Sequence, residues 1–273
     1  METGLADKVI VVTGASGGIG SAIARKFAGE GAKVVLHYRR QRAQVEALAL
    51  PEEQALPVSA DLTKEAAVRR LFDSAIKRFG RVDTLVANAG SWETRDVPLQ
   101  EMSLRQWRAT LDAVLTSTFL CAREFFKCVD RQKQGNAVLI ASTAAVFGEA
   151  GHADYASAKA AMAYGLTRTL KNEISRLAPH TKDYCGGRVN CICPGWTIVP
   201  RTAGKLKDVR SVRKITATMA LPQVARPDDI ANLAVFLSSD HLARHITGQT
   251  VLAAGGMEGR WLWQPEEVDP RNV

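Results

Sequence analysis

Short apolar runs alternate with longer helical patterns along this chain, and this alternation limits the folds that are open to it. A run without polar residues, such as Val9–Val12, is typical of a strand covered on both faces. Strands that alternate with helices favour an α/β fold with a parallel, doubly wound sheet. The predicted strands lie at 9–12, 33–36, 56–59, 83–87, 137–141, 189–192 and 250–253, and the long predicted helices at 64–79, 103–131, 154–177 and 227–239.

The length of 273 residues fits one large domain or two small ones, with room for a substantial core. No linker or second pattern divides the sequence, so we expect a single domain over 1–273. No run reaches about 18 apolar residues, which predicts no membrane span. The start, Met1-Glu2-Thr3, is not basic and predicts no signal peptide.

The cysteines and the net charge indicate the compartment and the partners. Five cysteines without a C-x-x-C pair predict reduced thiols in a cytoplasmic protein. Cys191 and Cys193 share one face of a predicted strand, where core packing is expected, and no metal site is predicted. A net charge of +8 would suit an anionic partner, but no nucleic-acid motif accompanies it, so we expect no nucleic-acid partner.

A glycine-rich turn, Thr13–Gly20, joins the first predicted strand to a helix that runs to about residue 28. Gly14 permits a tight turn, Gly18 lets a pyrophosphate approach the backbone, and Gly20 packs helix against strand. The amino end of the helix offers N–H donors and positive dipole to phosphates. The turn therefore predicts dinucleotide binding, with contacts at Gly14, Ser16, Gly18, Ile19 and Gly20.

Tyr155 and Lys159 stand four residues apart, on one face of a predicted helix. A phenol has an unperturbed pKa of about 10, and a neighbouring ammonium favours the phenolate. We therefore expect Lys159 to lower the pKa of Tyr155. Ser142 follows a predicted strand, at the edge where open α/β sheets bind ligands. The three side chains together predict an acid/base site.

The end of the second predicted strand indicates which dinucleotide binds. A ribose-binding acid is expected about 20 residues after the glycine turn, but Tyr38 stands there, and no Asp or Glu lies between Val34 and Val45. Arg39 and Arg40 follow at once. A guanidinium suits a 2′-phosphate, so we expect NADP(H) rather than NAD(H). The alternative interpretation is two solvated arginines that open a helix.

Together these residues resemble the short-chain dehydrogenase/reductase family. The family's Thr-Gly-x-x-x-Gly-x-Gly motif matches 13–20, its Asn-Ala-Gly matches 88–90, its Ser and Tyr-x-x-x-Lys match Ser142, Tyr155 and Lys159, and its Pro-Gly matches 194–195. The resemblance covers about 5–257 and is closest in overall pattern to 3-oxoacyl-carrier-protein reductase-like members. It implies a Rossmann-type domain with seven parallel strands, usually assembled as a homotetramer or homodimer.

The resemblance also implies a role for each matching residue. Tyr155 would protonate the carbonyl oxygen as hydride arrives, Ser142 would hydrogen-bond that oxygen, and Lys159 would hold the ribose hydroxyls. For Asp61 the resemblance implies a contact with the adenine. A role as a helix N-cap is an equally good interpretation of this residue. The further implied cofactor contacts are Asp61 and Leu62 at the adenine, Asn88, Ala89 and Gly90 in support, and Pro194 and Gly195 beside the nicotinamide.

Three residues depart from the family pattern. Val114 stands where the family has an Asn that helps to hold a water molecule for its proton relay, Val199 replaces a Thr, and Ala254 replaces an Asp. We expect Val114 to impair catalysis without abolishing it. Its backbone carbonyl can accept a hydrogen bond from water where the helix is distorted.

Two late segments follow no regular pattern. The segment 196–224 contains several basic residues and a single acid, Asp208. This composition indicates either a loop over an anionic or carrier-linked substrate or a solvated helical face. The tail, 258–273, contains an apolar patch that we expect at a subunit interface or docked over a site. The basic residues are Arg201, Lys205, Lys207, Arg210, Arg213 and Lys214, and the patch is Trp261, Leu262 and Trp263.

The sequence thus predicts an NADP(H)-dependent oxidoreductase that interconverts the carbonyl and secondary alcohol of a small molecule, with Tyr155 as acid/base. The alternative is an NADP(H)-binding protein whose catalysis is impaired because of Val114. A nucleic-acid or scaffold role has only the net charge of +8 in its favour.

Overall fold

The computed structural model describes residues 2–91, 93–263 and 265–268. Within these ranges, seven strands form one parallel sheet. They are β1 (Val9–Val12), β2 (Lys33–Tyr38), β3 (Ala55–Ser59), β4 (Thr84–Ala87), β5 (Asn136–Ile140), β6 (Arg188–Pro194) and β7 (Thr250–Ala253). Their order in the sheet is β3-β2-β1-β4-β5-β6-β7, which confirms the predicted doubly wound, Rossmann-type α/β class.

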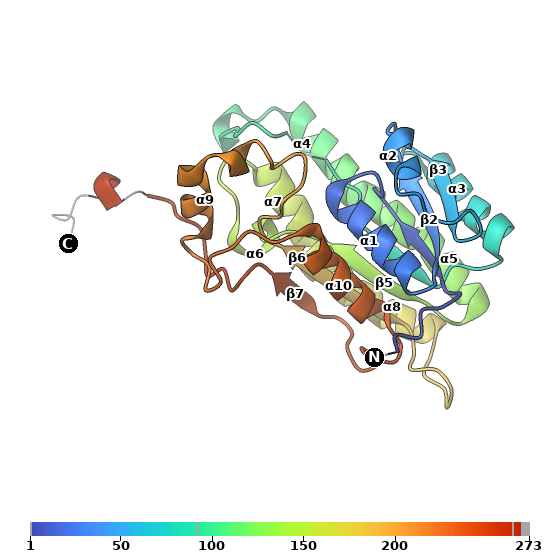
Figure 1. The fold of residues 1–273 in the computed structure, drawn as a ribbon. Coiled ribbons are helices and arrows are strands. Elements are labelled where there is room, and N and C mark those ends of the chain that lie inside the picture. The colour runs from blue at the N-terminus through green and yellow to red at the C-terminus, as the bar shows by residue number, and fades with distance from the viewer. Residues whose placement is uncertain (1, 92, 264, 269–273) are drawn as a thin grey trace.

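Helices cover both faces of this sheet (Figure 1). They are α1 (Gly18–Gly29), α2 (Arg42–Glu46), α3 (Glu65–Phe79), α4 (Leu104–Leu111), α5 (Ser117–Gln132), α6 (Ala144–Phe147), α7 (Ala153–Ala160), α8 (Thr167–Leu177), α9 (Val209–Thr216) and α10 (Pro227–Ser238). No helix in the described ranges has both the length and the apolar character needed to cross a membrane. Of the expected tail, residues 264 and 269–273 lie outside the described part.

Alternate residues of the central strands enter two separate cores. Val9 and Val11 pack with residues of α3, α5, α7 and α8, whereas Ile10 and Val12 pack with residues of α1, α2 and α10. Successive strand side chains point to opposite faces of a sheet. Burial on both faces therefore requires the continuous apolar runs that the sequence contains.

Two long predicted helices contain a π-helical segment that the hydrophobic pattern does not reveal. Asp112–Thr116 lies between α4 and α5, and Ala161–Leu166 lies between α7 and α8. A π-helical segment adds one residue to a turn, which shifts the face that later side chains present, and such segments often occur at functional sites. The first contains Val114, and the second begins two residues after Lys159.

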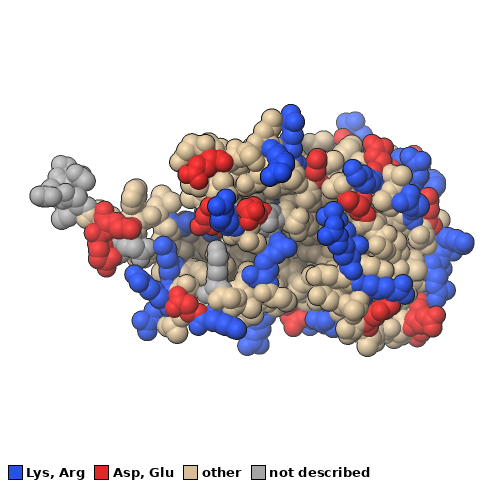
Figure 2. Space-filling view, turned by 90° about the horizontal axis from the view of Figure 1, so that it is seen from above, with Lys and Arg blue, Asp and Glu red and all other residues tan. Residues whose placement is uncertain are grey.

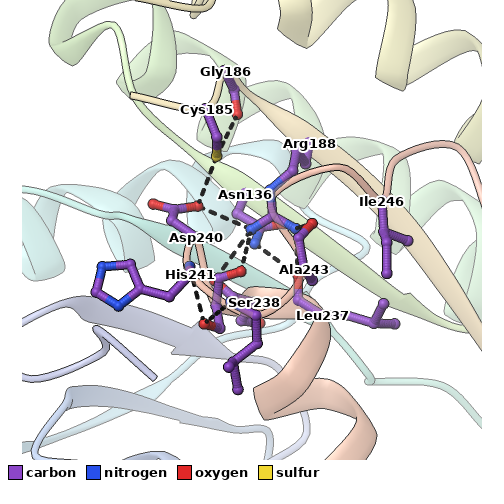
Figure 3. A network of polar contacts seen from close by, with 12 residues as sticks. Asn136, Cys185, Gly186, Arg188, Leu237, Ser238, Asp240, His241, Ala243 and Ile246 are labelled. Carbon is purple, nitrogen blue, oxygen red and sulfur yellow. Dashed lines mark hydrogen bonds and ion pairs between the residues drawn. The ribbon is translucent and has the colours of Figure 1, made fainter. Parts of the chain in front are cut away.

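At the amino edge of the sheet, the buried guanidinium of Arg188 binds the end of α10 (Figure 3). Nη1 donates to the carbonyl oxygens of Leu237 at 2.8 Å and Ala243 at 3.0 Å, and Nη2 donates to Asp240 Oδ1 at 2.9 Å. Asn136 also donates to the Leu237 carbonyl, at 3.0 Å. The last carbonyls of a helix lack intrahelical hydrogen-bond donors, and the Arg188 guanidinium supplies donors to them.

Replacement of Arg188 by Met should lower the free energy of unfolding by about 3 kcal/mol, because buried carbonyls and a carboxylate lose their donor. Urea denaturation measures this loss. Asp240→Asn is the matched control, since the Asp240 side chain is 32% exposed and its ion pair should be worth less than about 1 kcal/mol. An Arg188→Met protein with the unfolding midpoint of the unmodified protein would contradict this role.

Candidate active site

The carboxyl ends of four neighbouring strands bring the predicted site residues to one edge of the sheet. Thr13 follows β1, Asn88 follows β4, Ser142 lies two residues beyond β5, and Pro194 ends β6. The backbone amide of Thr143 donates to the Pro194 carbonyl at 2.9 Å, which joins the last two segments. Ligands of open α/β sheets bind at this edge.

The glycine turn is fixed by the segment that follows β4. Thr13 Oγ1 accepts hydrogen bonds from the backbone amides of Asn88 and Ala89, each at 2.9 Å. The side-chain Nδ2 of Asn88 donates to the carbonyls of Thr13 at 3.0 Å and Gly14 at 3.3 Å. Gly14 has a φ of +68°, and a Cβ at Gly20 would collide with its carbonyl oxygen. Asn88 and Ala89, expected to support the cofactor, thus hold the turn itself.

Gly18 faces the segment that follows β6. A Cβ at Gly18 would lie 2.5 Å from Val199 Cγ1, so a side chain there would displace the Val199 side chain. Sequence analysis assigns the missing side chain to the approach of a pyrophosphate. In this structure the space left by the missing side chain is also occupied by Val199, which therefore lies against the glycine turn.

His37, which the sequence analysis does not identify, ties the turn to the end of β3. Its buried ring accepts a hydrogen bond from the Gly14 amide at Nδ1, at 3.0 Å, so Nε2 carries the proton and donates to the Ala60 carbonyl, also at 3.0 Å. Burial lowers the pKa of His37, which favours the neutral ring. The signal in the sequence is a histidine directly after the apolar run Val34–Leu36.

The amino end of α1 fits the phosphates of a dinucleotide. Its N-cap residue, Gly17, provides no side-chain cap, and the first turn contains no acidic residue. The helix dipole and the backbone N–H donors therefore meet no competing carboxylate within this turn. The residues that would hold the phosphates are those of the predicted turn, Gly14, Ser16, Gly18, Ile19 and Gly20.

Ser142, Tyr155 and Lys159, the predicted catalytic residues, meet beyond the end of β5. Tyr155 and Ser142 are joined by a side-chain hydrogen bond. Lys159 Nζ lies 5.8 Å from the centre of the Tyr155 ring and donates to the Ile140 carbonyl at 2.6 Å. Tyr155 is 8% exposed and Lys159 only 4%. The structure therefore places a phenol, a hydroxyl and an amine together in a largely desolvated site.

Burial controls the acidity of this group. It raises the pKa of Tyr155 to about 12, against the opposing hydrogen bond with Ser142, and lowers the pKa of Lys159 to about 8. The expectation that Lys159 lowers the pKa of Tyr155 is wrong for this structure. The amine is directed to the Ile140 carbonyl, and desolvation of the phenolate dominates.

Two charged residues outside the predicted set act on Tyr155. The carboxylate of Glu149 raises the pKa of Tyr155, and the guanidinium of Arg201 lowers it. Both charges are thus close enough to influence the phenol. Arg201 belongs to the irregular segment 196–224, so this segment reaches the acid/base site.

Asp154 anchors the start of α7 to α4. One carboxylate oxygen accepts from Thr110 Oγ1 at 2.7 Å and from Gln106 Nε2 at 3.2 Å, and the other accepts from the backbone amide of Tyr155 at 2.8 Å. Asp154 is 1% exposed, and both of its carboxylate oxygens accept in these contacts. Sequence analysis misses this residue because its partners lie about 45 positions upstream.

Val114 and Lys159 both lie close to Gly90, and Val114 stands where the family pattern would place the Asn. A Cβ at Gly90 would lie 3.5 Å from Val114 Cγ2 and 3.9 Å from Lys159 Nζ, so the three residues converge. The helix is distorted at Val114, which lies in the π-helical segment. The Val114 carbonyl, which can accept a hydrogen bond from water at such a distortion, here accepts the hydroxyls of Thr118 at 2.7 Å and Ser117 at 3.3 Å.

Asp61 pairs with Arg39 and is not a helix N-cap. Helix α3 begins at Glu65, with Lys64 as its cap residue, so the N-cap interpretation is wrong. Asp61 Oδ1 instead accepts from the amide and hydroxyl of Thr63, and Oδ2 lies 3.5 Å from Arg39 Nη2. The contact with Thr63 is the main cause that lowers the pKa of Asp61.

The end of β2 divides the expected cofactor residues into buried and exposed groups. Tyr38 is buried, and so is Leu62 after β3, whereas Arg39 and Arg40 are exposed. An exposed guanidinium is accessible to an anionic group that arrives from solvent. The arginines therefore remain the expected partners of a 2′-phosphate.

The late segments flank the site. Asp208 accepts from the backbone amides of Arg210 and Ser211 as the N-cap of α9, so the single acid of this stretch is used in capping. In the tail, Trp261, Leu262 and Trp263 are exposed, and the chain leaves the body of the molecule here (Figure 1). Figure 2 shows basic side chains on one face interspersed with acidic ones, without a continuous basic patch.

The thiols and carboxylates form no metal centre in the described ranges, where no group of three His, Cys, Asp or Glu side chains could hold an ion. Cys191 and Cys193 are fully buried on one face of β6. This agrees with the packing role expected from their spacing.

Comparison with known proteins agrees with this arrangement. Residues 14–258 match the family described as enoyl-(acyl carrier protein) reductase. The chain is 34% identical to a 3-oxoacyl-[acyl-carrier-protein] reductase of Synechocystis sp., over 93% of this chain and 98% of the relative. It is 35% identical to a cis-4-hydroxycyclohexanecarboxylate dehydrogenase of Sinomonas cyclohexanicum (94% and 98%) and 35% identical to 3beta-hydroxysteroid dehydrogenase 1 of Eggerthella lenta (94% and 96%).

These relatives are all named as reductases or dehydrogenases, and each aligns along nearly its whole length. The match extends from the glycine turn to the segment beyond β7 and includes the Ser142, Tyr155 and Lys159 group. The chain belongs to the short-chain dehydrogenase/reductase family, oxidoreductases that act on CH–OH groups with NAD(P) as acceptor.

Proposed function

We propose that this protein is an NADP(H)-dependent oxidoreductase that interconverts a carbonyl and a secondary alcohol, with Tyr155 as the acid/base. The observation that carries the proposal is the buried group of Ser142, Tyr155 and Lys159 beside a glycine turn suited to phosphates. When bound, the nicotinamide cofactor supplies or accepts the hydride. The chain must then orient the substrate and move one proton.

In the direction of reduction, Tyr155 donates its proton to the carbonyl oxygen. A pKa of about 12 keeps the phenol protonated near neutral pH, which suits a donor. The Ser142 hydroxyl holds the same oxygen by a hydrogen bond. Lys159, with a pKa lowered to about 8, releases a proton more readily than an ordinary lysine, and we propose that it resupplies the phenol.

In the direction of oxidation, Tyr155 must first lose its proton. Its raised pKa disfavours the phenolate, so oxidation should accelerate as pH rises while reduction varies little near neutrality. The charge of Arg201 assists the phenolate and that of Glu149 opposes it. The residues around the phenol, rather than Tyr155 alone, therefore set the pH range of the reaction.

A panel of carbonyl compounds and alcohols, assayed with both nicotinamides, tests the function. The relatives' names suggest acyl thioesters, a cyclic hydroxy acid and a steroid as starting points. Anionic and neutral members of each class also test whether the basic residues of 201–214 attract an acidic or carrier-linked substrate. Turnover that is lost in Tyr155→Phe supports the proposal. Tight NADPH binding without turnover on any substrate supports the alternative of impaired catalysis.

Cofactor preference should depend on Arg39. Arg39→Asp should weaken NADPH binding roughly 10- to 100-fold and improve NADH binding, because a charge-assisted hydrogen bond to the 2′-phosphate is replaced by repulsion. Calorimetry measures both affinities, and Arg40→Asp is the matched comparison at the neighbouring position. If the unmodified protein binds NADH as tightly as NADPH, the assignment of NADP(H) fails.

Replacement of Val114 by Asn should raise kcat and leave NADPH affinity unchanged. The amide would place a polar group beside Lys159, where valine offers none, and general acid/base steps are worth at most about 10²- to 10⁴-fold. The unmodified protein should turn over measurably, with a steeper pH dependence than the Asn variant.

Val114→Ala is the control for this experiment, since it opens the same space without a polar atom. Val114 is fully buried, so the folded fraction of each variant is measured first. A rise in kcat for both variants, or for neither, would contradict the relay explanation.

We also propose that the protein is cytoplasmic and assembles as a homotetramer or homodimer, with the tail in a subunit contact. Trp261, Leu262 and Trp263 are 41%, 74% and 66% exposed, so much of this apolar patch is accessible to a second subunit. The double replacement Trp261→Ser and Trp263→Ser should shift the assembly toward monomer in sedimentation velocity. The same oligomer at equal concentrations of both proteins would exclude the tail from the interface.

A further inference from the structure

Arg260, in the C-terminal tail, makes three contacts with the connection between β5 and α7. Its Nε donates to the Gly148 carbonyl at 2.6 Å, and Nη2 lies 3.4 Å from Thr143 Oγ1 and 3.6 Å from Glu149 Oε2. The side chain is 19% exposed. A guanidinium has five donors in a fixed planar arrangement, which suits several acceptors at once.

These three contacts span the short helix α6. Thr143 is the N-cap of α6 and Gly148 is its C-cap, so the guanidinium joins both ends of the helix. Ser142 immediately precedes this helix, and α7, which carries Tyr155, begins at Ala153 soon after it. Arg260 therefore holds the stretch of chain that connects two catalytic residues.

The segment that carries Arg260 is itself fixed to the end of the irregular segment 196–224. Thr218 Oγ1 donates to the Gly259 carbonyl at 3.0 Å, and the Glu258 amide donates to the Thr218 carbonyl at 3.1 Å. Met219 and Met257 form a β-bridge and pack in a small apolar cluster against Phe147, which belongs to α6. The tail thus contacts the segment after α9 and α6 together.

We propose that Arg260 is a positioning residue for the reaction, which holds the connection 143–149, and with it Ser142 and Tyr155, against the segment that flanks the substrate. The role in turnover rests on the proposed oxidoreductase function. The contacts that define it are independent of that function, because they join parts of the chain to one another.

The same contact alters the charge that faces the phenol. Glu149 raises the pKa of Tyr155, and Arg260 lies 3.6 Å from its carboxylate and partly compensates it. Removal of the guanidinium should therefore raise the pKa of Tyr155 further. Such a variant leaves the other groups that act on the phenol chemically unchanged, and they are Ser142, Lys159, Cys193 and Arg201.

Arg260→Gln in the full chain tests the proposal, with Arg260→Lys as the conservative variant and the exposed Arg244→Gln as the control. Arg260→Gln should lower kcat roughly 10- to 100-fold with an unchanged KM for NADPH, since misplaced catalytic groups act on the chemical step. It should also move the pH profile of alcohol oxidation to higher pH. Arg260→Lys should keep the profile, because it keeps the charge.

A second substitution separates the charge from the contact. Glu149→Gln, added to Arg260→Gln, should return the pH profile toward that of the unmodified protein, because the uncompensated carboxylate is gone. The kcat should stay low, because the contacts with Gly148 and Thr143 are still missing. An unaltered alkaline shift in the double variant would overturn the electrostatic part of the proposal.

Amide hydrogen exchange of residues 143–149 gives a readout without substrate. Arg260→Gln should exchange faster there and Arg244→Gln should not. If the unmodified protein is inactive on every substrate, the proposed function fails, while exchange still decides whether the contact holds. In an active enzyme, unchanged kcat and pH profile in Arg260→Gln would overturn the positioning role, whatever the exchange rates.

Discussion

Helices on both faces of the parallel sheet confine charged chemistry to the strand ends. Most side chains in the middle of the strands enter one of two apolar cores, where an unpaired charge would be costly. At the amino edge, this leaves Arg188 and Asn136 to bind the end of α10. At the carboxyl edge, Ser142 and Asn88 stand just beyond the cores. One constraint thus produces a stabilising network at one edge and the candidate active site at the other.

Burial then determines what the reactive site can do. A phenol with a pKa of about 12 is a proton donor at neutral pH, and an amine with a pKa of about 8 is more easily deprotonated than a solvated one. The sequence alone suggests the opposite for Tyr155, because four-residue spacing indicates proximity to Lys159 but not the direction of the amine. Here the amine is directed to the Ile140 carbonyl. Spacing predicts neighbours, whereas the surrounding packing decides which interaction dominates.

The strands and the meeting of Ser142, Tyr155 and Lys159 could be predicted because local patterns carry them. Apolar runs mark buried strands, and the glycine turn and the Tyr155 to Lys159 spacing are each contained within a few residues. The contacts of His37, Asp154 and Arg260 join segments 23 to 117 positions apart, so no local pattern reveals them. The π-helical segments are not predicted for another reason, because one extra residue in a turn barely changes the hydrophobic period of the helix.

The sequence predicts least about the parts of the molecule that would border the substrate. The sheet and the acid/base group suit any carbonyl, and relatives at 34–35% identity bear names from three substrate classes. Selectivity must then come from side chains outside that group. Arg201 from the segment after β6 and Glu149 from the β5–α7 connection both act on the phenol, and Arg260 joins that connection to the tail. A change in any one of these segments therefore alters both the shape and the charge of the site, while the strand ends that hold Ser142 stay fixed.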